Sequence, residues 1–440
     1  MIMNSTNNEI LPQGYRMTEL GPLPEEWEVV RLGEVAEKMK AGGTPRRSVK
    51  EYWGGNIPFV LIEDMTSCNL YLSKTKETIT EEGLNSSSAW LVPPNTILLS
   101  MYATIGETAI NTIPVTTNQA ILAIIPKDNF DTVFGAYILK YNDQRLIMQN
   151  IQSTQKNVNK GIVDNFKIPL PPLPEQQKIA AVLSAVQEAK EKTQAVIDAT
   201  KALKKSMMKH LFTYGPVPPE ETENVPLKET EIGKVPEDWE VVKLGEVVRE
   251  KITDGTHKTP QYIENGIPFI TITNLVNGKI DFSKCRFISE EEHNFLINRC
   301  KPEKDDVLLS KVGTLGLTAK ICEKDNFSIF VQLALIKPKK EIINSDFLTY
   351  MLNSISIQNQ IEIKSSQSTM KYIGVEKISQ LQIPLPPLPV QQKIASILSA
   401  IDAKIEAEEN KKKSLEKLFK TLLHNLMTAK IRVNHLEIKV

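Results

Sequence analysis

The chain has 440 residues, of which 41% are hydrophobic and 24% charged, and its 53 basic residues balance its 53 acidic residues. This composition is typical of a globular protein with two to three domains, and the lack of any long apolar run excludes a membrane span. A neutral total does not exclude nucleic acid as a partner, because only the contact face must be positive.

The amino terminus and the cysteines indicate the compartment. The first ten residues, MIMNSTNNEI, are polar and lack the basic start and apolar stretch of a signal peptide, so we expect a cytoplasmic protein. Cys68, Cys285, Cys300 and Cys322 form no C-x-x-C pair. We predict that they are free thiols in a reducing cytosol and that they hold no zinc.

In chain order, the first notable segment is PEEWEVVRLGEV at residues 24–35, which returns as PEDWEVVKLGEV at residues 236–247. In each copy a turn with a tryptophan precedes a short amphipathic stretch, at 31–40 or 243–252. Since Trp27 and Trp239 stand in both copies, we predict core anchors rather than base-stacking side chains.

A middle segment of mixed character follows each tryptophan turn. Short apolar runs bounded by turn residues predict strands at 57–62, 96–101, 120–125, 267–272, 307–310 and 331–336. Helical stretches follow at 134–150 and 347–363, so an α+β fold is expected for each middle. Shared apolar and glycine positions imply one fold, whereas divergent polar positions imply two different surfaces.

A proline-rich bridge ends each middle. IPLPPLPEQQKIA at 168–180 returns as IPLPPLPVQQKIA at 383–395, and the two copies differ only at Glu175 and Val390. Polyproline geometry delays the helix, so Pro174 and Pro389 are predicted at the first helical position. A P-x-x-P ligand for a peptide-binding module is the alternative. Duplication at a strand-to-helix junction favours a rigid joint.

The segment after the second bridge predicts a coiled-coil helix with a polar interruption at Glu408 and Lys412. Its apolar positions are Ile394, Leu398, Ile401, Ile405, Leu415, Phe419, Leu422 and Leu426, and those of a weaker first copy are Ile179, Leu183, Val186, Ile197, Met207 and Leu211. We expect the two helices to pack against each other. Two amphipathic helices packed on separate domains are the alternative.

The repeat spans about half the chain, which is too long for a solenoid. It predicts one domain with a connecting helix, duplicated once, and an approximate two-fold that suits a target with two half-sites. The expected organisation is a first domain at 1–165, a joint and long helix at 166–213, a linker at 214–235, a second domain at 236–380, and a second joint and helix at 381–440.

Motifs for common catalytic chemistry are missing. The chain has no P-loop, no Rossmann-type glycine motif and no Asn-Pro-Pro-aromatic motif of an amino-methyltransferase. Its five histidines show no metal-ligand spacing. We therefore predict a non-enzyme without a metal.

Several motifs, in order and in duplicate, resemble the specificity subunit of type I restriction-modification systems. GGTPRRSVKEYWGGNIPF at 42–59 and DGTHKTPQYIENGIPF at 254–269 look like openings of target-recognition domains, and the segment 153–180 is similar to the family's junction signature. The resemblance runs from about Thr18 to about residue 430. Val390 departs from it, because the family usually has glutamate there.

The resemblance implies two mixed α/β target-recognition domains joined by two long antiparallel helices that form a coiled coil with pseudo-two-fold symmetry. It implies double-stranded DNA, read as a bipartite site, and two methyltransferase (modification) subunits as partners, with two motor-nuclease subunits in a restricting complex. No cofactor is expected on this chain. S-adenosylmethionine would lie on the methyltransferase, and ATP and Mg on the motor-nuclease.

Polar residues in the loops of both middles are the candidate DNA contacts. They are Thr44, Arg46, Arg47, Lys50, Thr104, Gln155, Lys156, Asn157, Thr256, His257, Lys258, Lys311, Thr314, Ser368 and Lys371. A solvated basic loop and polar turn-makers are the alternatives. The helix starts supply candidate contacts to partner subunits, namely Glu175, Gln176, Gln177, Gln391 and Gln392. A duplicated coiled-coil scaffold that binds no specific DNA sequence is the alternative function.

Overall fold

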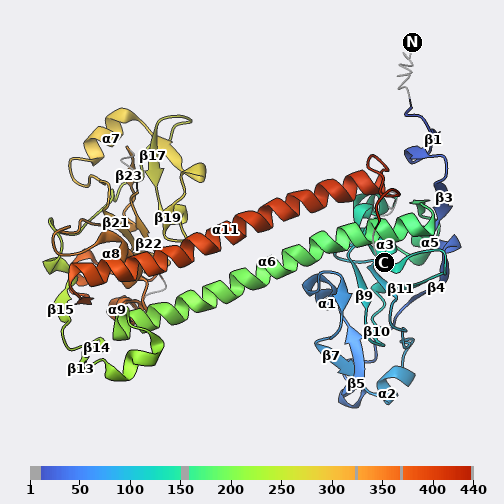
Figure 1. The fold of residues 1–440 in the computed structure, drawn as a ribbon, viewed down its shortest axis with the longest axis horizontal. Coiled ribbons are helices and arrows are strands. Elements are labelled where there is room, and N and C mark those ends of the chain that lie inside the picture. The colour runs from blue at the N-terminus through green and yellow to red at the C-terminus, as the bar shows by residue number, and fades with distance from the viewer. Residues whose placement is uncertain (1–10, 150–157, 323–325, 367–369, 438–440) are drawn as a thin grey trace, which may run out of the picture. The chain divides into compact units, whose positions relative to one another are not determined.

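The computed structural model describes residues 11–149, 158–322, 326–366 and 370–437 (Figure 1). The chain divides into two compact units. Unit 1 comprises Met1–Gln194 and Asn410–Val440, and unit 2 comprises Ala195–Glu409. Each unit therefore combines one middle segment with part of each of two long helices, so the α+β class predicted from the sequence is confirmed.

Unit 1 contains mixed sheets and short helices. Its strands are β1 (Tyr15–Thr18), β2 (Gly21–Pro24), β3 (Glu28–Arg31), β4 (Ala36–Ala41), β5 (Trp53–Val60), β6 (Tyr71–Leu72), β7 (Glu77–Ile79), β8 (Ile97–Ser100), β9 (Thr108–Asn111), β10 (Thr116–Thr117), β11 (Ile121–Pro126) and β12 (Lys167–Leu170). Its short helices are α1 (Ile62–Ser67), α2 (Glu81–Asn85), α3 (Thr132–Tyr141), α4 (Asp143–Met148) and α5 (Lys160–Asp164), with the 3-10 turns η1 (Leu32–Glu34) and η2 (Lys50–Tyr52).

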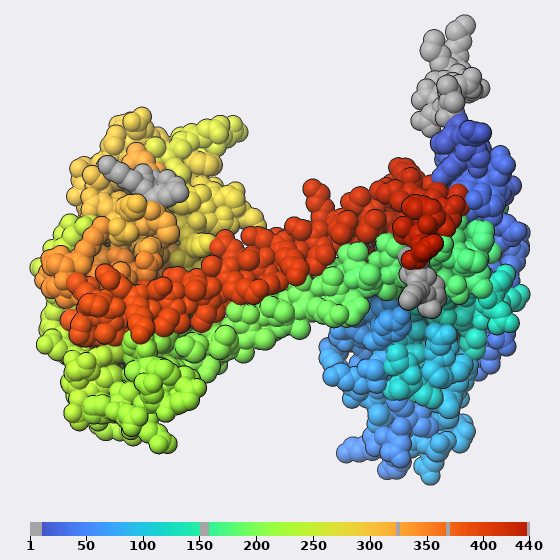
Figure 2. Space-filling view, viewed as in Figure 1, coloured from blue at the N-terminus to red at the C-terminus, as the bar shows by residue number. Residues whose placement is uncertain are grey.

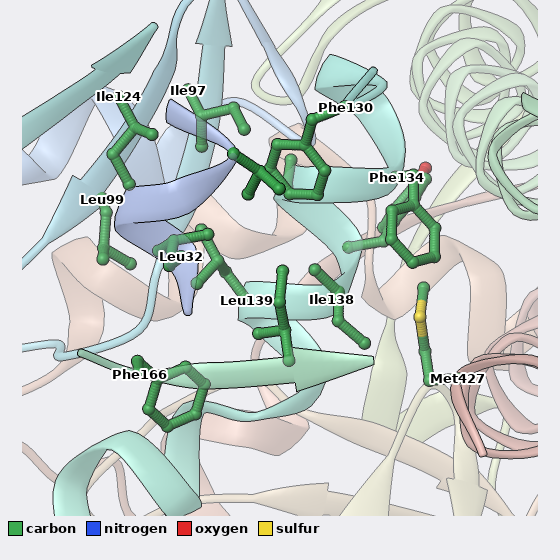
Figure 3. Close-up of a cluster of buried hydrophobic side chains, with 14 of the residues drawn as sticks. Leu32, Ile97, Leu99, Ile124, Phe130, Phe134, Ile138, Leu139, Phe166 and Met427 are labelled. Atoms are coloured by element: carbon green, nitrogen blue, oxygen red, sulfur yellow. The ribbon is translucent and has the colours of Figure 1, made fainter. Parts of the chain in front are cut away.

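The main sheet of unit 1 has the strand order β4-β11-β8-β9-β6, and all residues of its central strand β8 are buried. Successive side chains of a strand point to opposite faces. Ile97 and Leu99 of β8 therefore join the core beside α3, whereas Leu98 joins a second cluster with Val60. Figure 3 shows the first core, where Phe134 and Ile138 lie between the sheet and Met427. Because β8 is buried on both faces, its sequence reads as a continuous apolar run.

Unit 2 repeats this plan. Its strands are β13 (Leu227–Thr230), β14 (Gly233–Pro236), β15 (Glu240–Lys243), β16 (Thr253–Asp254), β17 (Ile267–Ile270), β18 (Leu275–Val276), β19 (Lys279–Ile280), β20 (Arg286–Ile288), β21 (Val307–Ser310), β22 (Thr318–Lys320), β23 (Ser328–Ile329), β24 (Leu333–Ile336) and β25 (Gln382–Leu385). Its short helices are α7 (Glu290–Leu296), α8 (Ser345–Leu352), α9 (Ile355–Lys364) and α10 (Val375–Ser379), with the turns η3 (Pro219–Asn224), η4 (Leu244–Glu246), η5 (Ile272–Asn274) and η6 (Phe282–Lys284).

Its main sheet has the order β16-β24-β21-β22, and Leu308 and Leu309 of β21 again enter two different cores. In both units the strand after the tryptophan pairs with the strand that leads into the bridge. Val30 of β3 lies opposite Ile168 of β12, and Val242 of β15 lies opposite Ile383 of β25. Trp27 and Trp239 are 0% and 2% exposed, so their prediction as core anchors is confirmed.

The long helices are α6 (Leu173–Tyr214) and α11 (Leu388–Met427). They run antiparallel, because residue numbers rise along one as they fall along the other. In unit 1 the ammonium of Lys190 lies over the ring of Phe419, and Lys412 donates to Gln194. In unit 2 Lys201 pairs with Glu409 and Lys204 with Asp402, and Figure 2 shows these helix segments side by side at the surface. The predicted mutual packing is confirmed.

Some predicted boundaries differ from the structure. The helical stretch 134–150 is two helices, α3 and α4, because Asn142 ends one and precedes the other. The stretch 347–363 is likewise split into α8 and α9. The strands predicted to reach 62 and 272 end at Val60 and Ile270. Both long helices begin one residue before the proline predicted at their first position.

The segment 214–235, predicted as a linker, contains the turn η3 and most of the hairpin β13-β14. This hairpin corresponds to β1-β2 of unit 1, so the second repeat begins earlier than its tryptophan turn. No helix within the described ranges is long and apolar enough to cross a membrane.

Candidate DNA interface

The basic loop of unit 1 begins where the backbone passes very close to a neighbouring strand. A Cβ on Gly42 would lie 1.9 Å from the carbonyl oxygen of Thr117, so only glycine fits there. The next amide, that of Gly43, donates to the same oxygen at 3.0 Å. The Thr44 hydroxyl then donates to Oε1 of Gln119 at 2.6 Å. These contacts fix the start of the loop, which carries the exposed side chains of Arg46, Arg47 and Lys50.

A second predicted loop of unit 1 lies against the same turn. The amide of Met101 donates to the carbonyl of Ala120 at 2.8 Å, and the amide of Val158 donates to the carbonyl of Met101 at 3.1 Å. Thr104 at the tip of this loop is exposed. Gln155, Lys156 and Asn157 lie outside the described residues. The structure thus brings the basic loop and the loop of Thr104 together around residues 118–120.

Unit 2 joins its predicted loops through a buried carboxylate. Asp254 is 6% exposed and pairs with three cationic or titratable side chains from separate segments. Lys311 approaches it at 3.0 Å, Arg299 at 2.6 Å and His257 at 3.3 Å. Lys311 is itself 7% exposed, so it holds the loops together from inside rather than facing DNA. Lys311 was predicted to contact DNA, and its burial in this ion pair favours a positioning role instead.

The remaining candidates of unit 2 lie on the surface beside this cluster. The amide of Ile373 donates to the carbonyl of Lys311 at 2.9 Å, and the amide of Gly313 donates to that of Lys371 at 2.9 Å. Lys371 is exposed and pairs with Glu362. Lys258 and Thr314 are exposed, and the hydroxyl of Thr256 donates to the carbonyl of Lys258. Ser368 lies outside the described residues.

The two units place equivalent loops by different chemistry. Aligning the repeated segments pairs Gly42 with Asp254 and Met101 with Lys311. Unit 1 therefore has a close backbone approach and an apolar side chain where unit 2 has a buried ion pair. Sequence reasoning missed Asp254 because Asp-Gly reads as a turn, and it missed Arg299 because its partner is distant in sequence.

Gln119 and Gln332 were also missed. Each lies in the turn that receives both loops of its unit: Gln119 accepts from Thr44, and the carbonyl of Gln332 accepts from the amide of Lys311. Gln119 is exposed and Gln332 half-buried. A glutamine at the same place in both middles was the available signal.

The first turns of α6 and α11 are held by hydrogen bonds to residues of their own units. Gln176, 1% exposed, accepts from the amide of Asp131 and donates to the carbonyls of Asn129 and Pro171. Gln391, 0% exposed, makes the same three contacts in unit 2 with Asn344, Ile342 and Pro386. These glutamines fix the helix starts to the caps of α3 and α8, so their prediction as partner contacts is corrected.

Glu175 is likewise internal, at 5% exposure. Its carboxylate accepts from the indole nitrogen of Trp27 at 2.9 Å and from two nitrogens of Arg432 at 2.7 and 2.8 Å. Val390 takes its place in unit 2 and packs against the core that contains Trp239. Of the five helix-start candidates, Gln177 is half-buried and Gln392 exposed.

Within the described ranges, no three or more His, Cys, Asp or Glu side chains are arranged to hold a metal ion. The polar groups gathered in each unit are loop donors and acceptors on a rigid sheet. This arrangement suits hydrogen bonding to a polar surface such as the edges of DNA bases.

Comparison with known proteins identifies the class of protein to which this fold and these loops belong. Residues 24–199 and 236–417 match the type I restriction modification DNA specificity domain. The chain belongs to this family. It is 31% identical to the type I restriction enzyme MjaVIII specificity subunit of Methanocaldococcus jannaschii over 94% of this chain and 95% of that protein. It is 28% identical to the MjaIX specificity subunit of the same organism, over 96% and 97%.

The fold is shared with a solved type I restriction-modification S subunit from M. genitalium. The TM-score is 0.57 at 16% identity, and the match covers 91% of this chain and 96% of the other. A chain from a study of complex assembly in a type I system gives a TM-score of 0.56 at 20% identity, over 93% and 99%. The family and fold class predicted from the sequence are confirmed. Membership supports a non-catalytic specificity subunit over the scaffold alternative.

Proposed function

We propose that unit 1 and unit 2 each read one half of a bipartite DNA site, and that α6 and α11 set the spacer and dock the methyltransferase subunits. The observation that carries this proposal is the contrast between frame and loops. Both units share the tryptophan turn, the bridge and the buried glutamine. They differ at Gly42 and Asp254, where the recognition loops begin. One frame with two loop chemistries suits two different half-sites.

The exposed polar side chains of these loops have the chemistry of DNA contacts. Arg46, Lys50 and Lys258 can neutralise phosphates, and Thr44 and Gln119 present groups that can pair with base edges. Contacts to phosphate position a protein, whereas contacts to base edges specify the sequence. Measurements of base preference and of salt dependence therefore distinguish the two roles for each side chain.

The proposed partners are double-stranded DNA, two methyltransferase subunits that carry S-adenosylmethionine, and two motor-nuclease subunits that use ATP and Mg in a restricting complex. The relatives' names as specificity subunits of restriction enzymes and the complex-assembly title of a structural neighbour support this set. The chain itself is proposed to carry no cofactor. We further propose that such a complex acts in the cytoplasm, where it would meet double-stranded DNA.

The test is methylation by the modification subunit, purified with and without this chain, on a library of bipartite DNA sequences. Methylation at one bipartite site that requires the chain is expected. Equal methylation without it would refute the proposal.

Replacing residues 20–160 by the corresponding segment of another specificity subunit tests the assignment of half-sites. We expect one half-site to change and the other to stay. A change in both would contradict separate reading by the two units.

A further inference from the structure

Unit 1 holds one arginine over the face of an aromatic ring at the base of its recognition loop. The guanidinium carbon of Arg47 lies 3.9 Å from the ring centre of Trp53. Trp53 in turn packs edge-on against the buried Phe59 of β5, with ring centres 5.2 Å apart. Nη1 of Arg47 donates to Glu77 of β7 at 2.6 Å. The arginine side chain is nevertheless 52% exposed, so it is positioned but uncovered.

Unit 2 has the same arrangement built from other segments. The guanidinium carbon of Arg286 lies 4.6 Å from the ring centre of Tyr262. Tyr262 packs against the buried Phe269 of β17, with ring centres 6.0 Å apart. Arg286 is exposed, and within the described ranges no carboxylate pairs with it.

The strand register shows that these are counterparts. Phe59 lies opposite Glu77, and Phe269 lies opposite Arg286. The position that supplies the carboxylate partner of Arg47 in unit 1 thus supplies the arginine itself in unit 2. Tyr262 lies one position before the residue that aligns with Trp53 when the two Ile-Pro-Phe segments are matched. The loop sequences differ, yet beside the Ile-Pro-Phe strand each unit places a guanidinium over an aromatic ring.

An aromatic face restrains a guanidinium in a plane and leaves its edge free. Arginine presents five N–H donors in a fixed fork, and the ring attracts the cation without using those donors. In unit 1 the bond to Glu77 occupies one donor and restricts rotation further. Such pre-organisation reduces the entropy lost on binding. A phosphate needs only positive charge nearby, whereas guanine O6 and N7 need an oriented fork.

We propose that Arg47, backed by Trp53, and Arg286, backed by Tyr262, each read a guanine in the half-site of their unit. This inference rests on the proposed function. Arg46 lies in the same loop as Arg47, but within the described residues its guanidinium packs on no aromatic ring, so we assign it a phosphate contact.

The experiment uses the full chain purified with its methyltransferase subunits. Methylation is measured on DNA libraries in which every position of both half-sites is varied. The variants are Arg47→Lys and Arg286→Lys, which keep the charge and remove the fork. Arg46→Gln, from the loop of Arg47, and Lys284→Gln, from the turn η6 that precedes β20, are the controls. The half-site that a variant does not touch serves as its internal control for folding.

We expect Arg47→Lys to reduce the preference for G·C at one position of one half-site by about tenfold or more, and Arg286→Lys to do so in the other half-site. Arg46→Gln lowers affinity for all sequences alike. A uniform loss with a shallower salt dependence in either lysine variant, unchanged base preference, or a wild-type half-site without G·C would overturn the inference. If wild-type protein selects no bipartite site, the proposed function itself fails.

Discussion

Arg432 and Glu175, which are 257 positions apart in the chain, form a two-pronged ion pair of 2.7 and 2.8 Å beside Trp27. Arg432 lies beyond the end of α11, and Glu175 lies in the first turn of α6. Nη2 of Arg432 also donates to Glu26 at 2.7 Å, and this bond lowers the pKa of the Glu26 carboxyl. The segment after α11 is thereby fastened to the frame of unit 1, with further bonds from Tyr15 to Ala429 and from Lys178 to Asn434.

The first prediction concerns this pair. Arg432→Ala leaves a buried carboxylate without its cation, and we expect it to destabilise the chain by about 3 kcal/mol. Glu175→Val copies the residue of unit 2, so the double variant should recover part of that loss. A double-mutant cycle by thermal unfolding measures the coupling. Additive losses would show that the pair contributes nothing beyond its separate side chains.

Val390→Glu is the matched variant in unit 2. It places a carboxylate at the core that contains Trp239, and the segment after α6, GPVPPEETEN at 215–224, has no basic residue. We expect a lower melting temperature than for Val390→Ala. A melting temperature equal to that of wild type would show that unit 2 accommodates the charge.

The Asp254 cluster gives a second prediction. Asp254→Asn leaves the buried cation of Lys311 facing a neutral amide, whereas Lys311→Met leaves Asp254 still paired with Arg299. We therefore expect the Asn variant to be the less stable of the two, by roughly 1–3 kcal/mol. Both should alter recognition of one half-site only. Thermal unfolding and library methylation test the two parts, and equal stability of both variants would contradict the central role of Asp254.

The long helices allow a third prediction. Seven residues inserted after Gln194 and seven after Glu409 lengthen both helices by about 10 Å while nearly preserving the direction of each face. If the helices set the spacer, the preferred spacer should grow by up to about three base pairs. Methylation of a spacer-length series measures this. Insertion in one helix alone is the control, and it should impair activity at every spacer.

Thiol reactivity gives a fourth prediction. Cys322 is exposed, whereas burial raises the pKa of Cys68 to about 11 and also raises that of Cys300. At pH 8 about one Cys68 side chain in a thousand is a thiolate, so its reaction with a disulfide reagent should be slow. We expect one fast phase that disappears in Cys322→Ser. Burial also raises the pKa of the half-buried Cys285. A fast phase that survives this substitution would show that Cys68, Cys285 or Cys300 is open to the reagent.

Much of the frame was predictable because it is written twice. The tryptophans, the bridges and the heptads carry strong periodic or positional signals, and the structure places them as expected. The break at Asn142 was not predictable from periodicity, since α3 and α4 continue one apolar pattern. The structure shows the cap, in which the side-chain amide of Asn142 donates to the carbonyl of Ile138.

The candidate site was less predictable. The loops were found by their position between strands, but the roles of individual side chains depend on partners far away in sequence. Lys311 read as an exposed cation until Asp254 was seen beside it. Gln176 and Gln391 read as surface residues of a helix start, yet both are buried by the caps of neighbouring helices. Composition and spacing carry no record of such contacts.

The single difference between the two bridges, Glu175 against Val390, also makes each bridge fit only its own unit. If recombination placed the first bridge in the second position, its carboxylate would meet the apolar core that contains Trp239. The reverse exchange would remove Glu175 from Arg432 and leave it paired with Glu26 in unit 1. Misassembled genes would therefore yield less stable proteins, while exchanges confined to the middles would not disturb either bridge. One position out of thirteen thus favours the reshuffling of target sequences while keeping each half of the frame in its place.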